Sequence, residues 1–212
     1  NGEIHSSGMN YNNTIFLTSF GGEILQLTGK GELIWSATVE GKIRATPRIY
    51  NNVLYIGTSQ GVIHAIDLKT KSVLWASEEL TIADKGTGLT GLLQSKLHIN
   101  GISTSIASDG KYLYFGTVYG VFYVVDIKNG EVIEGYDFAT ELEFKQREMI
   151  TSEPVLTKEM VMVSYGERFV VFDNSKRTLN KKLEYMGYVT SPFIREESIT
   201  FVTNFGDIYT VK

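Results

Sequence analysis

Short runs of hydrophobic and β-branched residues, separated by small polar turns, extend along almost the whole chain. Residues of these types favour β-strands, and polar pairs such as Asn51-Asn52 and Asp109-Gly110 tolerate the positive φ angles of a tight hairpin. The pattern therefore predicts sets of four short antiparallel strands. In one such set the expected strands are 46–50, 53–58, 62–67 and 73–75.

The same set recurs along the chain at intervals of about 40 residues. A shift of 39 positions places Tyr11-Asn12-Asn13 on Tyr50-Asn51-Asn52, and further copies begin near Ile102, Ile150 and Tyr188. Four antiparallel strands in a unit of this length, repeated five times, are typical of a β-propeller, in which each blade buries its faces against its neighbours.

We therefore predict an all-β fold, a single β-propeller domain over residues 1–212 with about five four-stranded blades. The fifth blade ends after its third strand. It is either incomplete or closed by a terminal strand from residues 1–4, which resemble Asn129-Gly130-Glu131-Val132. The sequence is compatible with two arrangements, a closed ring of five blades and a part of a larger propeller. The expected blades are 6–35, 45–75, 103–134, 151–184 and 190–212, with an insertion at 77–101 on the face that carries the turns between second and third strands.

Composition narrows the classes of function. The chain has 20 basic and 24 acidic residues and a net charge of −4, which argues against a nucleic-acid partner. It has no cysteine, which excludes disulfides, thiolate metal sites and cysteine nucleophiles. Since no apolar run approaches the ~18 residues that cross a bilayer, we expect no membrane span. The histidines, at 5, 64 and 98, lie far apart in the sequence, so we expect no metal site.

A family resemblance is carried by the segment from Gly57 to Asp67 with the following Leu74-Trp75, and Gly120 to Glu131 repeats it. These residues resemble the pyrroloquinoline-quinone-type propeller repeat, which occurs in quinoprotein dehydrogenases and in cofactor-free relatives. The relatives include the lipoprotein of outer-membrane β-barrel assembly and several sensor-kinase domains. The resemblance implies an extracytoplasmic setting, periplasmic or at the surface of a bacterial cell.

The quinone enzymes of this family typically use a calcium ion, an Asp base and two adjacent cysteines. Because cysteine is absent and no asymmetric set of calcium ligands stands out, we expect no cofactor, no catalytic residues and no enzyme activity. Two recurring residue types are interpreted as structural. Aspartates at the end of the third strand should cap the next turn, and tryptophans on the fourth strand should pack between blades. They are Asp67, Asp126 and Asp173, and Trp35 and Trp75.

Aromatic residues occupy the turns between second and third strands, on the face that carries the insertion. They are Phe20, Tyr119, Tyr165 and Phe205, with Gln60 in the second blade. Exposed aromatic side chains anchor many protein interfaces, so these four residues predict a partner-binding surface. Alternatively, each ring folds over its own hairpin or onto the neighbouring blade.

The start of each first strand is expected to lie nearest the central channel. His5 and Arg44 occupy equivalent positions there in the first two blades, and Arg44 suggests a site for a small anionic ligand. A G-x-G-x-x-G match at 86–91 lacks the strand and helix that a dinucleotide site requires, so we interpret it as a loop.

The leading hypothesis is a non-catalytic protein-interaction or scaffold propeller with a protein partner. It would act as an envelope assembly factor or as the sensor domain of a larger protein. The alternative is a receptor that binds a small molecule, a quinone or an anionic metabolite, at the mouth of the channel.

Overall fold

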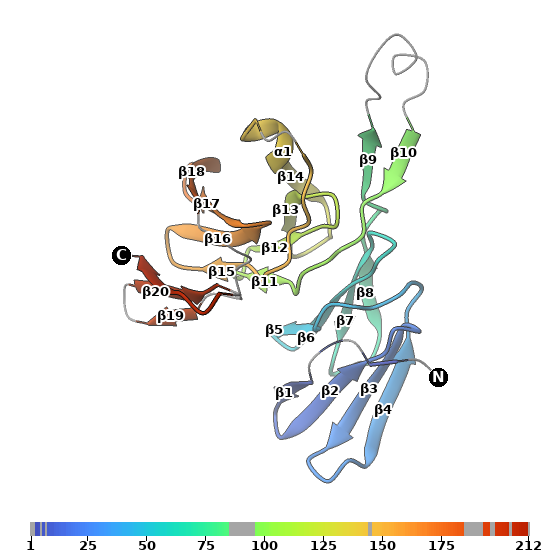
Figure 1. The fold of residues 1–212 in the computed structure, drawn as a ribbon. Helices are drawn as coiled ribbons and strands as arrows, with labels where there is room; N and C mark the ends of the chain where they lie inside the picture. Colours follow the sequence, from blue (N-terminus) through green and yellow to red (C-terminus); the bar gives the residue numbers. More distant parts are fainter. Residues whose placement is uncertain are drawn as a thin grey trace.

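The computed structural model describes residues 3–4, 6, 8–84, 96–143, 146–184, 193–195, 198–203 and 205–211. Within them, five antiparallel sheets stand around a common centre, and the first strand of each of the first four sheets lies innermost (Figure 1). We number these sheets blades 1 to 5 in chain order. The arrangement confirms the predicted all-β propeller with about five blades.

Each blade is a meander, in which neighbouring strands follow one another in the chain. Blade 1 contains β1 (Met9–Tyr11), β2 (Thr14–Thr18), β3 (Glu23–Thr28) and β4 (Leu33–Thr38). Blade 2 contains β5 (Arg48–Tyr50), β6 (Val53–Gly57), β7 (Ile63–Asp67) and β8 (Val73–Ala76). Blade 3 contains β11 (Ala107–Ser108), β12 (Tyr112–Gly116), β13 (Val121–Asp126) and β14 (Val132–Asp137). Blade 4 contains β15 (Val155–Leu156), β16 (Met160–Tyr165), β17 (Arg168–Asp173) and β18 (Thr178–Glu184), and blade 5 contains β19 (Phe193–Arg195), β20 (Ser198–Val202) and β21 (Ile208–Val211).

The turns within the blades form for local reasons that the sequence shows. Asn51 and Asn52 join β5 to β6 with φ angles of 47° and 63°, as a two-residue hairpin turn requires. After β7, one carboxylate oxygen of Asp67 accepts hydrogen bonds from the backbone N–H groups of Lys69 and Thr70, at 2.6 and 2.8 Å. Asp126 and Asp173 cap the equivalent turns of blades 3 and 4, which confirms the capping prediction.

The hydrophobic core lies between the blades. Four clusters of buried residues occupy the four junctions between neighbouring blades. Trp35 and Trp75 pack at the edges of two of these clusters, as predicted. The Trp75 indole contacts the turn of the next blade at Gly130, where an added side-chain carbon would lie 2.6 Å from the ring. Each blade is thus stabilised mainly by its neighbours.

The sheets trace an open arc, with blades 1 and 5 at its two ends (Figure 1). Blade 5 has three strands among the described residues. Glu3 is part of the segment that could close the ring. Its backbone carbonyl accepts a hydrogen bond of 2.7 Å from the N–H of Phe20, which places Glu3 at the start of blade 1. The outer face of blade 5 is uncovered. Its Ile208 is 71% exposed, whereas the equivalent Ile24, Ile63 and Phe122 are fully buried.

The insertion forms a two-stranded hairpin, β9 (Thr81–Asp84) and β10 (Lys96–Ile99), which projects away from the blades (Figure 1). At its base Leu80 is buried in the core, and its carbonyl accepts a hydrogen bond of 2.7 Å from the N–H of Asn100. The G-x-G-x-x-G match at 86–91 lies outside the described residues. A short helix, α1 (Phe138–Glu141), follows blade 3. Across the described ranges, no helix is long and apolar enough to cross a bilayer.

Candidate functional site

The turns between second and third strands lie at one end of the propeller together with the segments that enter each blade. We call this end the turn face; its turns are 19–22, 58–62, 117–120 and 166–167, with the described residues 203 and 205–207 of blade 5. In blades 1 to 3 a backbone N–H of the turn donates to a carbonyl of the entering segment. The pairs are Phe20 to Glu3, Ser59 to Lys42 and Val118 to Gly101, at 2.7, 2.8 and 2.9 Å. These bonds place turn and entering segment side by side on the surface.

Tyr165 is part of the core, so the expectation that its ring is exposed at a turn is wrong. The backbone at Tyr165 pairs with Ile150 as Thr58 pairs with Ile43, but β16 extends to Tyr165, whereas β6 ends at Gly57 and leaves Thr58 in the turn. The following turn has only two residues, because Tyr165 pairs directly with Arg168. The tyrosine is 0% exposed, and its hydroxyl accepts a hydrogen bond from the N–H of Glu148, at 3.0 Å.

Phe20 lies half-buried on the turn face of blade 1, beneath two cations. Lys42 Nζ lies 5.0 Å and Arg44 Cζ 5.2 Å from the centre of its ring, within cation–π range. Lys42 and Arg44 point outward because Ile43 and Ala45, between and after them, are buried. The structure thus brings together Phe20 and Arg44, which the sequence assigned to different sites. His5 lies outside the described residues.

Tyr119 and Phe205 occupy the same turn position, each before a glycine with positive φ, Gly120 or Gly206. Phe205 is 70% exposed and Tyr119 is half-buried. The Tyr119 carbonyl accepts a hydrogen bond of 3.3 Å from Arg147, which also pairs with Asp137. The three accessible aromatic rings therefore lie on blades 1, 3 and 5.

Three exposed aliphatic side chains near Tyr119 were not predicted. Ile99, Val118 and Met149 are each more than a third exposed. Backbone hydrogen bonds join their segments, from Val118 to Gly101 and from Ile150 to Thr117. We call Ile99, Val118, Tyr119 and Met149 the blade 3 patch. Only the position of Val118 within its turn could have indicated the patch from sequence.

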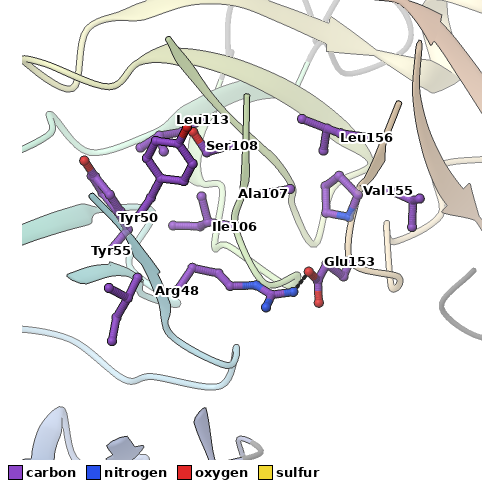
Figure 2. Close-up of a pocket in the computed structure, with 12 residues that line it drawn as sticks. Arg48, Tyr50, Tyr55, Ile106, Ala107, Ser108, Leu113, Glu153, Val155 and Leu156 are labelled. Atoms are coloured by element: carbon purple, nitrogen blue, oxygen red, sulfur yellow. Dashed lines mark ion pairs between the residues drawn. The ribbon is translucent and has the colours of Figure 1, made fainter. Parts of the chain in front are cut away.

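A cavity of about 430 Å³ lies among the inner strands of blades 2, 3 and 4, away from the turn-face aromatics. Arg48 on β5 reaches across it and forms an ion pair with Glu153, just before β15 (Figure 2). Burial lowers the pKa of Arg48. Burial, with a smaller electrostatic contribution from the nearby Tyr50, raises the pKa of Tyr55 to about 12. Both tyrosines line the cavity, and Tyr55 is neutral at physiological pH.

Arg44 lines neither this cavity nor a second hollow of about 490 Å³, which lies between the outer parts of blades 2 and 3. Within the described part of the chain, no three His, Asp or Glu side chains gather as metal ligands would.

Comparison with known proteins gives a family and a fold. The family model described as outer membrane protein assembly factor BamB matches residues 2–212. A search of curated proteins finds no match. Among solved structures, BamB from Moraxella catarrhalis superposes with a TM-score of 0.71 at 13% identity, over 99% of this chain and 61% of that one. The chain thus spans less than two thirds of the length of that relative.

Two further structures have similar folds. The WD40 domain of Pan2 from Neurospora crassa gives a TM-score of 0.68 at 11% identity, over 98% of this chain and 60% of that one. The computationally designed protein Ika4 gives 0.60 at 16% identity, over 82% of this chain and 92% of that one. At such identities these likenesses show the propeller fold.

Proposed function

Because the chain belongs to the family of the outer membrane protein assembly factor BamB, we propose that it is a non-catalytic propeller that binds a protein partner through its turn face. The observation that carries the proposal is the set of exposed apolar side chains on that face, namely Phe205 and the aliphatic residues of the blade 3 patch, Ile99, Val118 and Met149. Surfaces with accessible aromatic and aliphatic anchors of this kind are typical of protein interfaces.

The charged groups of the turn face support the same proposal. Lys42 and Arg44 lie over Phe20, and among the described residues no carboxylate is within ion-pair distance of either. They can pair with acidic groups of a partner at the rim of the contact, where charges guide association more than they add affinity. We expect a partner with an apolar centre and an acidic margin.

We place this role outside the cytoplasm, in a bacterial envelope, where the chain contributes to assembly of outer-membrane proteins. The description of the BamB family as outer membrane protein assembly factors supports the assembly role. A sensor domain of a larger protein would use the same surface for a different partner. A receptor for an anionic ligand at Arg44 has less support, because Arg44 lines neither of the two cavities described above.

Site-specific photo-crosslinking tests the partner surface. A photoreactive phenylalanine analogue is introduced at Val118 or at Phe205, and the protein is irradiated with a detergent-solubilised bacterial envelope. We expect the same partner to crosslink from both positions, as identified by mass spectrometry, and excess unlabelled protein to compete. Both side chains are exposed, so each substitution should change the free energy of unfolding by less than about 0.5 kcal/mol.

The matched control carries the analogue at Glu159, an exposed residue between β15 and β16 at the opposite end of blade 4. No specific product should form from that position. If position 159 gives the same products as 118 and 205, or if neither turn-face position gives a product that competes, the turn face is not the binding surface.

A further inference from the structure

The cavity among the inner strands breaks the symmetry of the repeat. In every blade, the same position of the first strand pairs with the second strand. In blade 3 this position is occupied by Ala107, the smallest of the five equivalent residues. The small side chain of Ala107 leaves a hollow over blade 3, which β5 and β15 flank (Figure 2). The equivalent residues are Met9, Arg48, Ala107, Val155 and Phe193. A site formed in one place only is what a ligand requires, whereas a feature of every blade serves the fold.

The walls of the cavity are mainly apolar, with a few polar groups that converge on it. Aliphatic side chains come from all three blades, and Tyr50 and Tyr55 stand on the blade 2 side. Among the described residues, neither tyrosine hydroxyl has a hydrogen-bond partner. The cavity has a volume of about 430 Å³, which lies in the range of small-molecule sites, and such sites combine apolar walls with few polar groups.

The polar groups have opposite charges and are accessible. The Arg48 and Glu153 side chains are 40% and 31% exposed, and each is the only charged partner of the other among the described residues. A ligand with one charge would pair with one of them and leave the other unpaired, which is unfavourable. A purely apolar ligand would cover the tyrosine hydroxyls and the ion pair without offering hydrogen bonds.

We propose that this cavity binds a zwitterionic α-amino acid with an aromatic side chain. The carboxylate of the ligand pairs with the Arg48 guanidinium, which suits two parallel hydrogen bonds, and the ammonium pairs with Glu153. The ring lies over Ala107 between the apolar walls. A polar ring atom, such as the indole N–H of tryptophan, then reaches a tyrosine hydroxyl. This site is separate from the turn face and does not depend on partner binding there.

The proposal is tested by isothermal titration calorimetry with three compounds that share one indole ring. L-tryptophan carries both charges, tryptamine only the positive one and indole-3-propionate only the negative one. We expect tryptophan to bind at least ~10-fold more tightly than either analogue and to raise the melting temperature, because it binds only the folded state. Equal affinities of all three compounds, or no heat and no thermal shift at millimolar tryptophan, would overturn the proposal.

Two variants separate the cavity from the ion pair, using residues that the repeat itself supplies. Ala107→Met introduces the residue of blade 1 and fills the cavity, and it should weaken tryptophan binding at least ~10-fold. Arg48→Met with Glu153→Thr removes both charges and should abolish the preference for tryptophan over its analogues. Glu159→Met, on an exposed turn outside the cavity, is the control. Unchanged tryptophan binding by a folded Ala107→Met variant would contradict the site.

Discussion

At the scale of single residues, the turn aspartates show how one carboxylate holds a blade hairpin together. One oxygen of Asp173 accepts hydrogen bonds from the backbone N–H groups of Ser175 and Lys176, at 3.0 and 2.9 Å. The Lys176 N–H and the Ser175 hydroxyl favour the charged form and lower the pKa of Asp173 to about 2. The turn is therefore stabilised by the negative charge as well as by the shape of the side chain.

Replacement of Asp173 by asparagine tests this charge, because asparagine keeps an acceptor oxygen but is neutral. A lowered pKa means that the stabilisation is complete above the ordinary value of 3.8 and is lost as pH falls through about 2. We expect Asp173→Asn to melt at a lower temperature than the natural protein at pH 7. The difference should close as pH approaches 2, as measured by circular dichroism.

The control for this prediction is Asp207→Asn. Asp207 is exposed, and its carboxylate forms no hydrogen bond with another described residue. Its substitution should leave the melting temperature nearly unchanged at every pH. A difference between the natural protein and Asp173→Asn that is equally large at pH 7 and pH 2 would show that charge is not the cause.

Local features of this kind could be predicted from sequence, because a turn depends on the residues within it. The Asn51-Asn52 turn and the aspartate caps are examples. The exposure of Tyr165 was predicted wrongly, because it depends on the length of a strand as well as on the residues of a turn. Its exposure depends on where β16 ends, and blade 4 has a turn of only two residues, so the strand takes in a tyrosine that alignment of the copies assigns to the turn.

At the scale of elements, the inserted hairpin is attached to the propeller at a narrow base. Leu80 and Asn100 are joined by a backbone hydrogen bond, and both are buried. Beyond them β9 and β10 contact each other, with Ile82 paired with His98. A two-stranded ribbon with no further strand beside it adds little to the stability of the whole.

The hairpin can therefore be shortened without loss of the fold. Replacement of residues 83–97 by Asn-Gly joins Ile82 to His98 through a two-residue turn that matches the twist of paired strands. Because the base and Ile82 are retained, we expect the free energy of unfolding in urea to change by less than about 1 kcal/mol. A loss of cooperative unfolding would mean that the removed segment is part of the core.

A paired variant with Leu80→Ser serves as the comparison. Leu80 belongs to the core cluster between blades 2 and 3, so its substitution should destabilise the fold by roughly 2–5 kcal/mol.

The hairpin and α1 were not predicted from sequence. Neither has a counterpart in the other copies, so the repeat, which identified every blade, gives no information about them.

At the scale of the whole molecule, neighbouring blades approach closely at one repeated contact. The residue that ends the second strand is glycine in blades 2 and 3, and an isoleucine from the next blade packs against it. A methyl group at Gly57 would lie 2.6 Å from the Ile102 side chain. The absence of a side chain therefore allows the buried isoleucine to seat between two blades.

Gly57→Ala should consequently weaken the junction of blades 2 and 3 by about 1–3 kcal/mol in urea unfolding, because a packed core resists added volume. In the background of Ile102→Ala, where the contact is gone, the same change should cost much less. Gly29→Ala, where an added carbon meets nothing within 4 Å, is the control. Equal costs in both backgrounds would exclude this contact as the cause.

The number of blades could be predicted from sequence because each copy contains its own strands. The open arc could not, because the angle between neighbouring blades depends on contacts such as those of Gly57 and Gly116 with the following isoleucine. For the same reason the cavity was missed. Its residues come from three copies, and the ion pair of Arg48 with Glu153 joins blades that are not consecutive.

The uncovered face of blade 5 affects how the chain behaves as a solute. Ile208 is the first residue of β21, and the outward N–H and C=O groups of this strand have no strand partner among the described residues. Apolar surface next to unpaired backbone attracts identical surfaces on other molecules. We therefore expect self-association to increase as the protein is concentrated, and replacement of Ile208 by lysine to reduce it, which would help to obtain solutions concentrated enough for crystallisation or nuclear magnetic resonance.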